Sequence, residues 1–508
     1  MGSSAPGADS NCEPWDIFAR GQVLPQSVAY LILPVSTRGS FEQRIANANA
    51  TIELDRWGIR SPWSDEGPAI NVGAEHRTDS VEFTPDAFSQ SGDIAGFTPQ
   101  VSPIHGSIST SEIFGEARIP LVTMGFVQRL AFEGGFRKSW YHNGRSRFST
   151  NAYKLALDLT PVTWLRLRAS QQRANRAPNV QELFTPAQAS SFDRDRCAGA
   201  TPDASEAQCA LTGAMPGQYG HILAAPSPVS AYHSVIGGNV ELQPEIATTR
   251  TIGLVLEPRI LRNFNLTLDW WDIGLDGAIA QVGAQSILNN CLATGDPFFC
   301  NRIHRDPNGS LWLGNGYVDD RQANIGSLRV RGVDIGTDYS APVGRWGSAH
   351  FEFHGSYVLR WITDKGGFSM PYDCVGLFGD PCGIHPQWKH VARATWDTPS
   401  RHSLSINWRH TSGVTLAALD PKFNLTDSVS AANARLAAQD YFDLATRIRI
   451  RKEVELRLGV NNIFDRQPPR IVRNTAAGVG PVNGNTYPEW YDALGRYIFA
   501  SATMNFRP

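Results

Sequence analysis

The chain has 508 residues, of which 46 are glycine and 32 are proline, and this density of residues that interrupt helices argues against a mostly helical protein. Basic and acidic residues nearly balance, with a formal net charge of -2, so no general basic field is available to bind nucleic acid. The longest unbroken apolar stretch, at 28–33, is far shorter than the roughly 20 residues of a transmembrane helix. Any membrane-spanning structure must therefore be a β-barrel, because only helices and closed barrels satisfy the backbone in lipid.

Six of the seven cysteines form pairs of near neighbours in the sequence. These pairs are Cys197 with Cys209, Cys291 with Cys300, and Cys374 with Cys382. Each pair lies in a stretch rich in Pro, Gly, Asp and Asn, and none has the CxxC spacing of a zinc or redox site. We predict three local disulfides that staple long loops, in preference to unpaired buried thiols, and therefore an oxidising compartment. The N-terminus lacks the cationic and apolar regions of a signal peptide, so we expect the start of the natural chain to be absent.

Alternation of apolar and polar residues with period two recurs along the chain over about ten positions at a time. The expected strands lie near 43–56, 68–79, 110–120, 126–140, 149–159, 163–173, 245–257, 264–276, 327–340, 349–359, 386–397, 403–409, 442–451, 453–461 and 496–506. About fifteen strands result, with little helical pattern between them. Their length exceeds the five or six residues common in soluble proteins and matches a tilted membrane strand.

Charged residues on one face of these strands indicate a wet interior. Arg447, Arg449 and Arg451 form one such row, which suits a wide barrel lumen better than a packed core. Tryptophans near the expected strand ends predict an interfacial girdle, although the core of a soluble sandwich is an alternative place for them. They are Trp270, Trp271, Trp346, Trp361, Trp388 and Trp396.

The connections alternate between short and long, as in outer-membrane barrels with tight periplasmic turns and extended outer loops. The long connections are 174–244, 277–326, 363–385, 414–440 and 465–495. If the chain ends in the periplasm, every long connection and all seven cysteines lie outside the cell. The predicted fold is therefore an all-β, antiparallel transmembrane β-barrel with long extracellular loops, in which the first strand begins outside and the last ends inside.

Four segments carry a resemblance to a known family. They are 173–184 (RANRAPNVQELF), 238–245 (GNVELQPE), 458–465 (LGVNNIFD) and the closing strand 495–506 (GRYIFASATMNF). In this order they resemble the "FRAPN…ELF", "GNPxLxPE" and "xGVxNLFD" motifs and the terminal aromatic strand of TonB-dependent outer-membrane receptors. Before residue 173 the similarity is softer and rests on 12–18 and 73–77.

The resemblance implies a barrel of 22 strands around a plug domain. About fifteen strands are expected here, so residues 1–508 are interpreted as a partial barrel domain that lacks the plug and the TonB box. Cys12, which has no partner among the pairs, is then expected to have lost it with the missing N-terminal part. Arg507 and Pro508 extend beyond the terminal Phe506 that the family uses as an assembly signal.

The function implied by the resemblance is active uptake of a scarce nutrient across the outer membrane of a Gram-negative bacterium. The family's ligands include ferric siderophores, cobalamin, haem and oligosaccharides. The implied partners are outer-membrane lipid and lipopolysaccharide, the small-molecule or oligosaccharide substrate, and the TonB complex through the missing plug. Two alternatives remain open, namely a passive porin-like or adhesin barrel and a secreted β-rich carbohydrate-binding protein or enzyme.

Motifs of enzymes are not found. HExxH, a P-loop and GxSxG are all missing from the sequence, so we expect no catalytic residues, no resident metal and no cofactor. The excess of arginine suits a lumen for anionic substrates or contacts with outer-leaflet phosphates, and a GC-rich coding bias explains it equally well.

Histidines and aromatics in the long loops are the candidate ligand-binding residues, because they suit a metal chelate, a sugar or a catecholate. The candidates are His221, Tyr232, His233, Trp312 and Tyr317. The alternative is that the histidines are simply solvated and the aromatic rings pack the loops.

Overall fold

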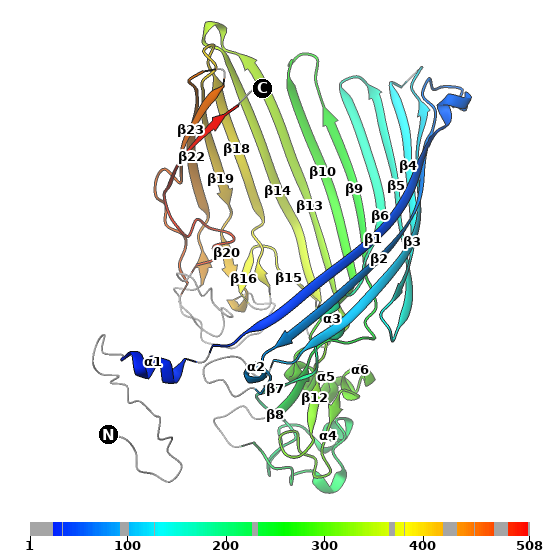
Figure 1. Cartoon of the computed structure of the whole chain (residues 1–508), viewed down its shortest axis with the longest axis vertical. Coiled ribbons are helices and arrows are strands. Elements are labelled where there is room, and N and C mark those ends of the chain that lie inside the picture. Colours follow the sequence, from blue (N-terminus) through cyan, green and yellow to red (C-terminus); the bar gives the residue numbers. More distant parts are fainter. Residues whose placement is uncertain are drawn as a thin grey trace.

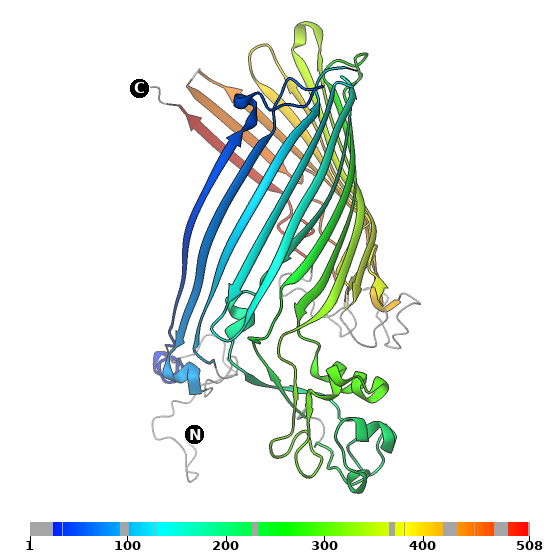
Figure 2. The same cartoon turned by 90° about the vertical axis from the view of Figure 1, so that its right-hand side faces the viewer.

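The computed structural model describes residues 24–32, 34–91, 101–125, 127–225, 232–364, 371–379, 382–419, 434–451, 453–471 and 486–505. Fifteen long antiparallel strands follow one another in sequence order in a single sheet that curves into an incomplete barrel (Figures 1 and 2). They are β1 (Thr37–Glu53), β2 (Ala69–Pro85), β3 (Ile104–Val122), β4 (Arg129–His142), β5 (Arg147–Val162), β6 (Leu165–Arg176), β9 (Glu245–Leu256), β10 (Phe264–Ala280), β13 (Ala323–Pro342), β14 (Ser348–Asp364), β18 (Trp388–Asp397), β19 (Ser403–Thr411), β22 (Gln439–Arg449), β23 (Val454–Asn461) and β24 (Tyr497–Met504). The short strand β15 (Tyr372–Asp373) adds to β14. The predicted fold class and strand number are confirmed, and among the described residues β1 and β24 do not pair, so the barrel is not closed.

The two ends of the sheet differ as predicted. Tight turns join the strands at the upper end of Figure 1, which we call the turn end. The long connections gather at the lower end, which we call the loop end, and β1 begins there. Two connections were not expected. The turn-end connection 54–68 is long and contains the 3-10 helix η1 (Leu54–Trp57), whereas the loop-end connection 143–146 is short. In the latter, the Asn143 side-chain oxygen accepts hydrogen bonds from the backbone N–H groups of Arg145 and Ser146 at 3.1 and 2.7 Å, which fixes a tight turn.

The register of the strands shows which residues share the inner face of the sheet and which share the outer face. A row on the outer face consists of Leu167, Leu254, Leu268 and Ile335, which lie side by side on four consecutive strands. The opposite face carries ion pairs such as Arg168 Nη2 with Asp269 Oδ2 at 2.5 Å. Helix α3 (Val180–Phe184) lies against this charged face, where the Phe184 ring fills the space that a side chain at Gly106 would take. The charged face is therefore the interior, in agreement with the predicted wet lumen.

The expected tryptophan girdle is only partly right. Trp270 and Trp271 lie in the middle of β10 and not near its end. Trp271 shares the inner face with Asp269 and packs over Gly332, while Trp361 is also turned inward, opposite Val330. Trp346 does lie at the turn end, in the 3-10 helix η3 (Gly344–Trp346). The long strands continue well beyond the apolar belt, so the middle of a strand is not the middle of the membrane.

The long connections fold into substructures of their own (Figure 1). The larger one, which we call the outer lobe, is built from the described residues of 177–225, 232–244 and 281–322. It contains the sheet β11 (Ile303–His304), β12 (Tyr317–Asp319), β8 (Tyr232–Ile236) and β7 (Gln188–Phe192), with helices α4 (Glu206–Leu211), α5 (Ala284–Thr294) and α6 (Pro297–Cys300) and the 3-10 helix η2 (Pro216–Gln218). A smaller sheet consists of β17 (Gly383–Ile384), β16 (Leu377–Gly379), β20 (Val414–Leu416) and β21 (Arg435–Leu436), followed after β20 by η4 (Ala417–Leu419). Helices α1 (Pro25–Leu31) and α2 (Ala87–Ser91) complete the described elements.

The three predicted disulfides are confirmed. Their S–S lengths are 2.11 Å for Cys197–Cys209, 2.08 Å for Cys291–Cys300 and 2.06 Å for Cys374–Cys382. The first two belong to the apolar core of the outer lobe, where Ile287, Leu288, Leu311 and Val318 are completely buried. Cys12 and the C-terminal Phe506 lie outside the described residues. No helix in the described part of the chain has the length and apolar character needed to cross a membrane.

Candidate functional site

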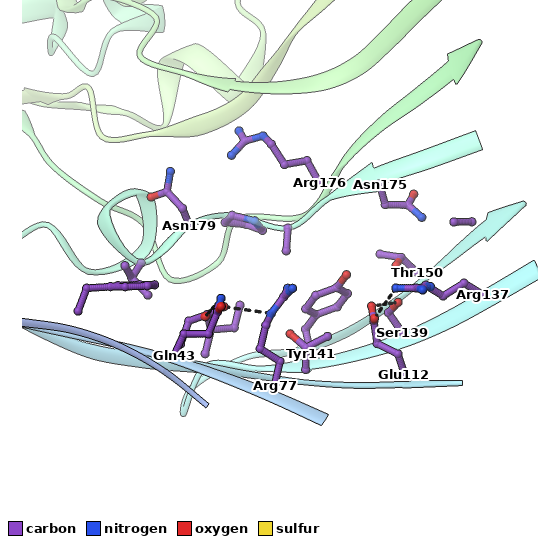
Figure 3. A pocket seen from close by; sticks show the side chains of 18 residues that line it. Gln43, Arg77, Glu112, Arg137, Ser139, Tyr141, Thr150, Asn175, Arg176 and Asn179 are labelled. Carbon is purple, nitrogen blue, oxygen red and sulfur yellow. Dashed lines mark hydrogen bonds and ion pairs between the residues drawn. The ribbon is translucent and has the colours of Figure 1, made fainter. Parts of the chain in front are cut away.

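A cavity of about 530 Å³ opens on the inner face of the sheet at its loop end (Figure 3). Its floor is formed by inward side chains of β1 to β5, and its wall by the segment 175–180 that leads from β6 into α3. The polar residues around it are Gln43, Arg77, Asp79, Thr110, Glu112, Arg137, Ser139, Tyr141, Thr150, Asn175, Arg176 and Asn179. We call this space the mouth cavity.

Two arginines on the floor of the mouth cavity are each held by a single carboxylate. Arg137 Nη1 donates to Glu112 Oε2 at 2.8 Å, and Ser139 Oγ donates to the other oxygen of Glu112 at 2.5 Å. Arg77 Nε lies 3.3 Å from Asp79 Oδ2, but this nitrogen makes no hydrogen bond with good geometry. A guanidinium has five N–H donors, so both arginines keep donors for an anionic or oxygen-rich ligand.

The wall of the cavity is fixed by Arg176. Its Nε donates to Glu245 Oε2 at 2.6 Å, and its two terminal nitrogens donate to Glu182 at 2.9 and 3.0 Å. Asn179 and Glu182 form a capping box at the start of α3. Arg176 therefore joins the end of β6, helix α3 and the start of β9. The two motif segments 173–184 and 238–245 are therefore held together by the contacts of Arg176 with Glu182 and Glu245. These contacts are the physical reason why the arginine and the two glutamates occur together.

The segment before β9 is seated on the rim by backbone contacts. Val240 O accepts hydrogen bonds from Asn143 Nδ2 and Ser146 Oγ, both at 3.0 Å. A side chain at Gly238 would lie 2.8 Å from Glu182 O, so only glycine permits this approach. Leu242 is 1% exposed and packs with Leu183 of α3 and its neighbours. The rim above the cavity is therefore rigidly built.

A second inner site lies on β18, β19 and β22. Arg409 donates to Asp443 and to Asp492, with Nε–Oδ2 and Nη2–Oδ2 distances of 2.8 and 2.6 Å. The Lys389 ammonium lies 4.2 Å from the centre of the Trp490 ring. The described loop 486–496 is thus tied to the lumen wall beside a cavity of about 570 Å³. Within this loop, burial raises the pKa of Tyr491 to about 12.

The motif at 458–465 shapes the end of β23. The Asn462 side-chain oxygen accepts the backbone N–H of Arg466 at 2.8 Å, and Asp465 Oδ1 accepts that of Arg496 at 2.9 Å. Both Asn462 and Asp465 have a positive φ, at 51° and 54°, which asparagine and aspartate tolerate better than most residues. This segment therefore sets the approach of the chain to β24 and is structural.

The five ligand-binding candidates from the sequence all lie in the outer lobe and do not line the mouth cavity. Tyr232 is 5% exposed, packs against Phe192 with ring centres 5.5 Å apart, and accepts the Ala225 N–H at 3.1 Å. Trp312 Nε1 donates to Leu223 O at 2.8 Å.

The remaining three candidates are His221, His233 and Tyr317, and Tyr317 is half-buried like Trp312. The Tyr317 ring is stacked on His304 with centres 4.7 Å apart. His221 and His233 are exposed. The structure does not bring the five residues together at one point, and ligand contact at each stays a prediction. Among the described residues, no group of three or more His, Cys, Asp and Glu side chains is placed to hold a metal ion.

An apolar outer face, a charged interior and long loops at one end define a transmembrane β-barrel. A family model described as "TonB dependent receptor-like, beta-barrel" matches residues 17–463. The chain belongs to this family. It is an outer-membrane protein of the Gram-negative type, and the family consists of receptors and transporters and not of enzymes, in agreement with the expectation from the sequence.

Solved structures of similar fold support this assignment. A mutant of the ferric enterobactin receptor PfeA of Pseudomonas aeruginosa has a TM-score of 0.59 and 14% identity, covering 92% of this chain and 54% of that one. The siderophore receptor PirA of Acinetobacter baumannii has a TM-score of 0.54 and 13% identity, covering 92% and 55%. The copper transporter OprC has a TM-score of 0.52 and 12% identity, covering 93% and 57%. A comparison with curated protein sequences gives no match. The chain thus spans about half the length of the solved structures it resembles, and its similarity to them concerns the fold.

Proposed function

We propose that this chain provides the barrel wall and the outer capture loops of a receptor that takes up a scarce small-molecule nutrient by TonB-coupled transport. The observation that carries the proposal is the mouth cavity, which lies on the inner face at the end of the sheet from which the outer lobe extends (Figures 1 and 3). A ligand caught by the lobe would pass this cavity on its way into the lumen.

The chemistry of the cavity favours an oxygen-rich, negatively charged ligand. Arg77 and Arg137 retain free N–H donors, and Tyr141, Asn175 and Asn179 add neutral polar groups. A ferric siderophore fits this description better than cobalamin or haem, because its metal-binding oxygens match the arginine donors, while the apolar side chains of Phe41, Ile108 and Val180 that also line the cavity can contact the apolar parts of such a ligand. An acidic oligosaccharide is the second ligand class. In the receptor as a whole, contact with TonB belongs to the plug and the TonB box of the family.

Uptake of ⁵⁵Fe-labelled siderophores by cells that express the protein tests this proposal. Arg77→Gln and Arg137→Gln are each expected to weaken ligand binding about 10- to 100-fold, because a hydrogen bond to a charged group contributes about 1.5–3 kcal/mol. Arg393→Gln is a matched control, since Arg393 lies on the inner face of β18, outside the mouth cavity. Immunoblots of outer membranes show whether the variants reach the membrane in equal amounts.

The same assay separates the alternatives. A TonB-coupled receptor stops transporting when an ionophore collapses the proton gradient, whereas a passive porin-like barrel does not. Transport that resists the ionophore would overturn the coupled mechanism. A chain that stays monomeric and soluble without detergent would contradict the membrane assignment and favour a secreted carbohydrate-binding protein.

A further inference from the structure

The outer face of β6 to β14 changes abruptly from apolar to basic toward the loop end. One cross-strand row consists of Ala169, Ile252, Trp270, Val333 and Tyr357, and Ile252 is 61% exposed. The next row toward the loops consists of Gln171, Arg250, Asp272, Arg331 and Arg360. The row after that consists of Arg173, Thr248, Gly274, Arg329 and Ile362. Two adjacent rows therefore hold five arginines and one aspartate, and we call these two rows the arginine face.

Most of the positive charge on the arginine face is uncompensated. Arg331 pairs with Asp272, and its guanidinium also lies over the Trp270 ring at 5.7 Å. The other four arginines make no ion pair with any residue that the structure describes. Arg173 Nε is enclosed yet has no hydrogen-bond partner. Further toward the loops the face turns acidic again at Asp276 and Asp364, so the basic groups form a band of limited height.

The position of this band identifies the layer that it meets. The apolar row on the turn side of this band faces the hydrocarbon of the membrane, and the loops on its other side lie on the outer side of the membrane. The arginine face is therefore level with the head groups of the outer leaflet. Arginine binds phosphate through two parallel hydrogen bonds, and clusters of basic residues at this level are typical sites for anionic head groups.

We propose that the arginine face is a binding site for the phosphorylated glycolipid of the outer leaflet, with the phosphates of lipid A on the arginines and its acyl chains on the apolar row. Neighbouring strands are about 4.8 Å apart and alternate residues about 6.7 Å apart. From β9 to β14 the basic band therefore extends over about 14 Å, which suits a disaccharide that carries a phosphate at each end. The proposal depends on the outer-membrane location and not on the proposed transport, so either can fail without the other.

Binding of defined lipids to the full-length protein in detergent tests this site. The probes are diphosphoryl lipid A, monophosphoryl lipid A and phosphatidylglycerol, each measured by native mass spectrometry. The unaltered protein is expected to bind the diphosphoryl form at least 10-fold more tightly than the other two. Equal binding of all three lipids would overturn the proposal, because it would mean a nonspecific attraction to anionic lipid. This comparison needs no variant.

A triple substitution then locates the site. Arg250→Gln, Arg329→Gln and Arg360→Gln together are expected to weaken binding of diphosphoryl lipid A about 100-fold, since each basic group near an anionic surface contributes about fivefold. The matched control is the triple substitution of Arg262, Arg345 and Arg451 by glutamine at the turn end of the sheet, which is expected to leave binding unchanged. A shift in gel mobility on heating verifies that each barrel is folded. Equal loss in both triple variants, or no loss in the first, would place the lipid elsewhere and refute the proposal.

Discussion

The buried ion pair of the outer lobe allows a strong test of what holds the lobe together. Asp195 and Arg305 have side chains that are 0% and 3% exposed, and two parallel hydrogen bonds of 2.6 and 3.1 Å join them. Arg305 Nε also donates to Thr212 Oγ1 at 2.9 Å, and Asp195 Oδ1 accepts the Cys197 N–H at 3.0 Å. This pair therefore connects the first disulfide to the segment around β11.

The perturbation is Asp195→Asn, which keeps the shape of the side chain and removes its charge. Loss of one partner leaves the other charge buried without compensation, which costs about 3–5 kcal/mol. The nearby pair Arg194–Asp203 is a matched control, because its side chains are 67% and 43% exposed. Asp203→Asn is expected to cost less than about 1 kcal/mol.

Hydrogen exchange of the lobe amides measures both changes. In Asp195→Asn the free energy of opening of α4 should fall by several kcal/mol, which raises its exchange rate by a factor of 100 or more, while the amides of the long strands stay protected. Limited proteolysis should cut the lobe of the same variant first. If Asp195→Asn and Asp203→Asn open the lobe equally, the buried pair does not hold it and the reasoning is refuted.

Three further changes have defined outcomes. Replacing Cys197 and Cys209 by alanine should destabilise the lobe by about 3 kcal/mol from lost loop closure, seen as a lower melting temperature of the lobe with unchanged mobility of the barrel on gels. Gly332→Val should prevent correct assembly, because its Cβ would lie 2.4 Å from Trp271 Cζ2 and the strand backbone cannot move away; normal amounts of heat-modifiable barrel would disprove this. Burial holds the pKa of His385 below its ordinary value of 6.5, so the neutral form is favoured in the fold and the hairpin of β16 and β17 should lose stability as the pH falls below about 6.5. Exchange rates corrected for intrinsic pH effects should show this loss, and His385→Phe should abolish it.

The strands were predictable because the membrane and the lumen impose opposite chemistry on alternate residues. Leu456 and Leu458 face outward on β23 while Arg447 and Arg449 face inward on β22, and period-two alternation reports this directly. The disulfides were predictable because each joins cysteines close in sequence within one loop. The position of Trp271 was not predictable in this way, since an aromatic residue next to polar ones is compatible with both an interfacial and an inward position.

The candidate site was not predictable from the same signals. Arg77, Glu112 and Arg137 lie on three strands, and only the register of those strands brings them to one height. Sequence alternation gives the face of each residue but not its height relative to neighbouring strands. Tyr232 is a ligand-contact candidate from the sequence because it is an aromatic residue in a long loop, with loop packing as the alternative. In the structure its ring packs in the hydrophobic core of the outer lobe, and ligand contact stays a prediction.

The length of the strands decides what the cell surface presents. β13 has 20 residues, or about 66 Å of chain, and at a tilt near 45° it rises about 47 Å, whereas the apolar band of such barrels is about 25 Å tall. Roughly 20 Å of the barrel wall therefore extends beyond the bilayer, at the height of the lipopolysaccharide sugars next to the membrane. The cysteine-stapled lobe extends from this end of the wall and therefore lies farther from the bilayer than the wall does. Antibodies, phages and surface proteases would meet the lobe first, and sequence change under their pressure should concentrate there while the wall below stays shielded.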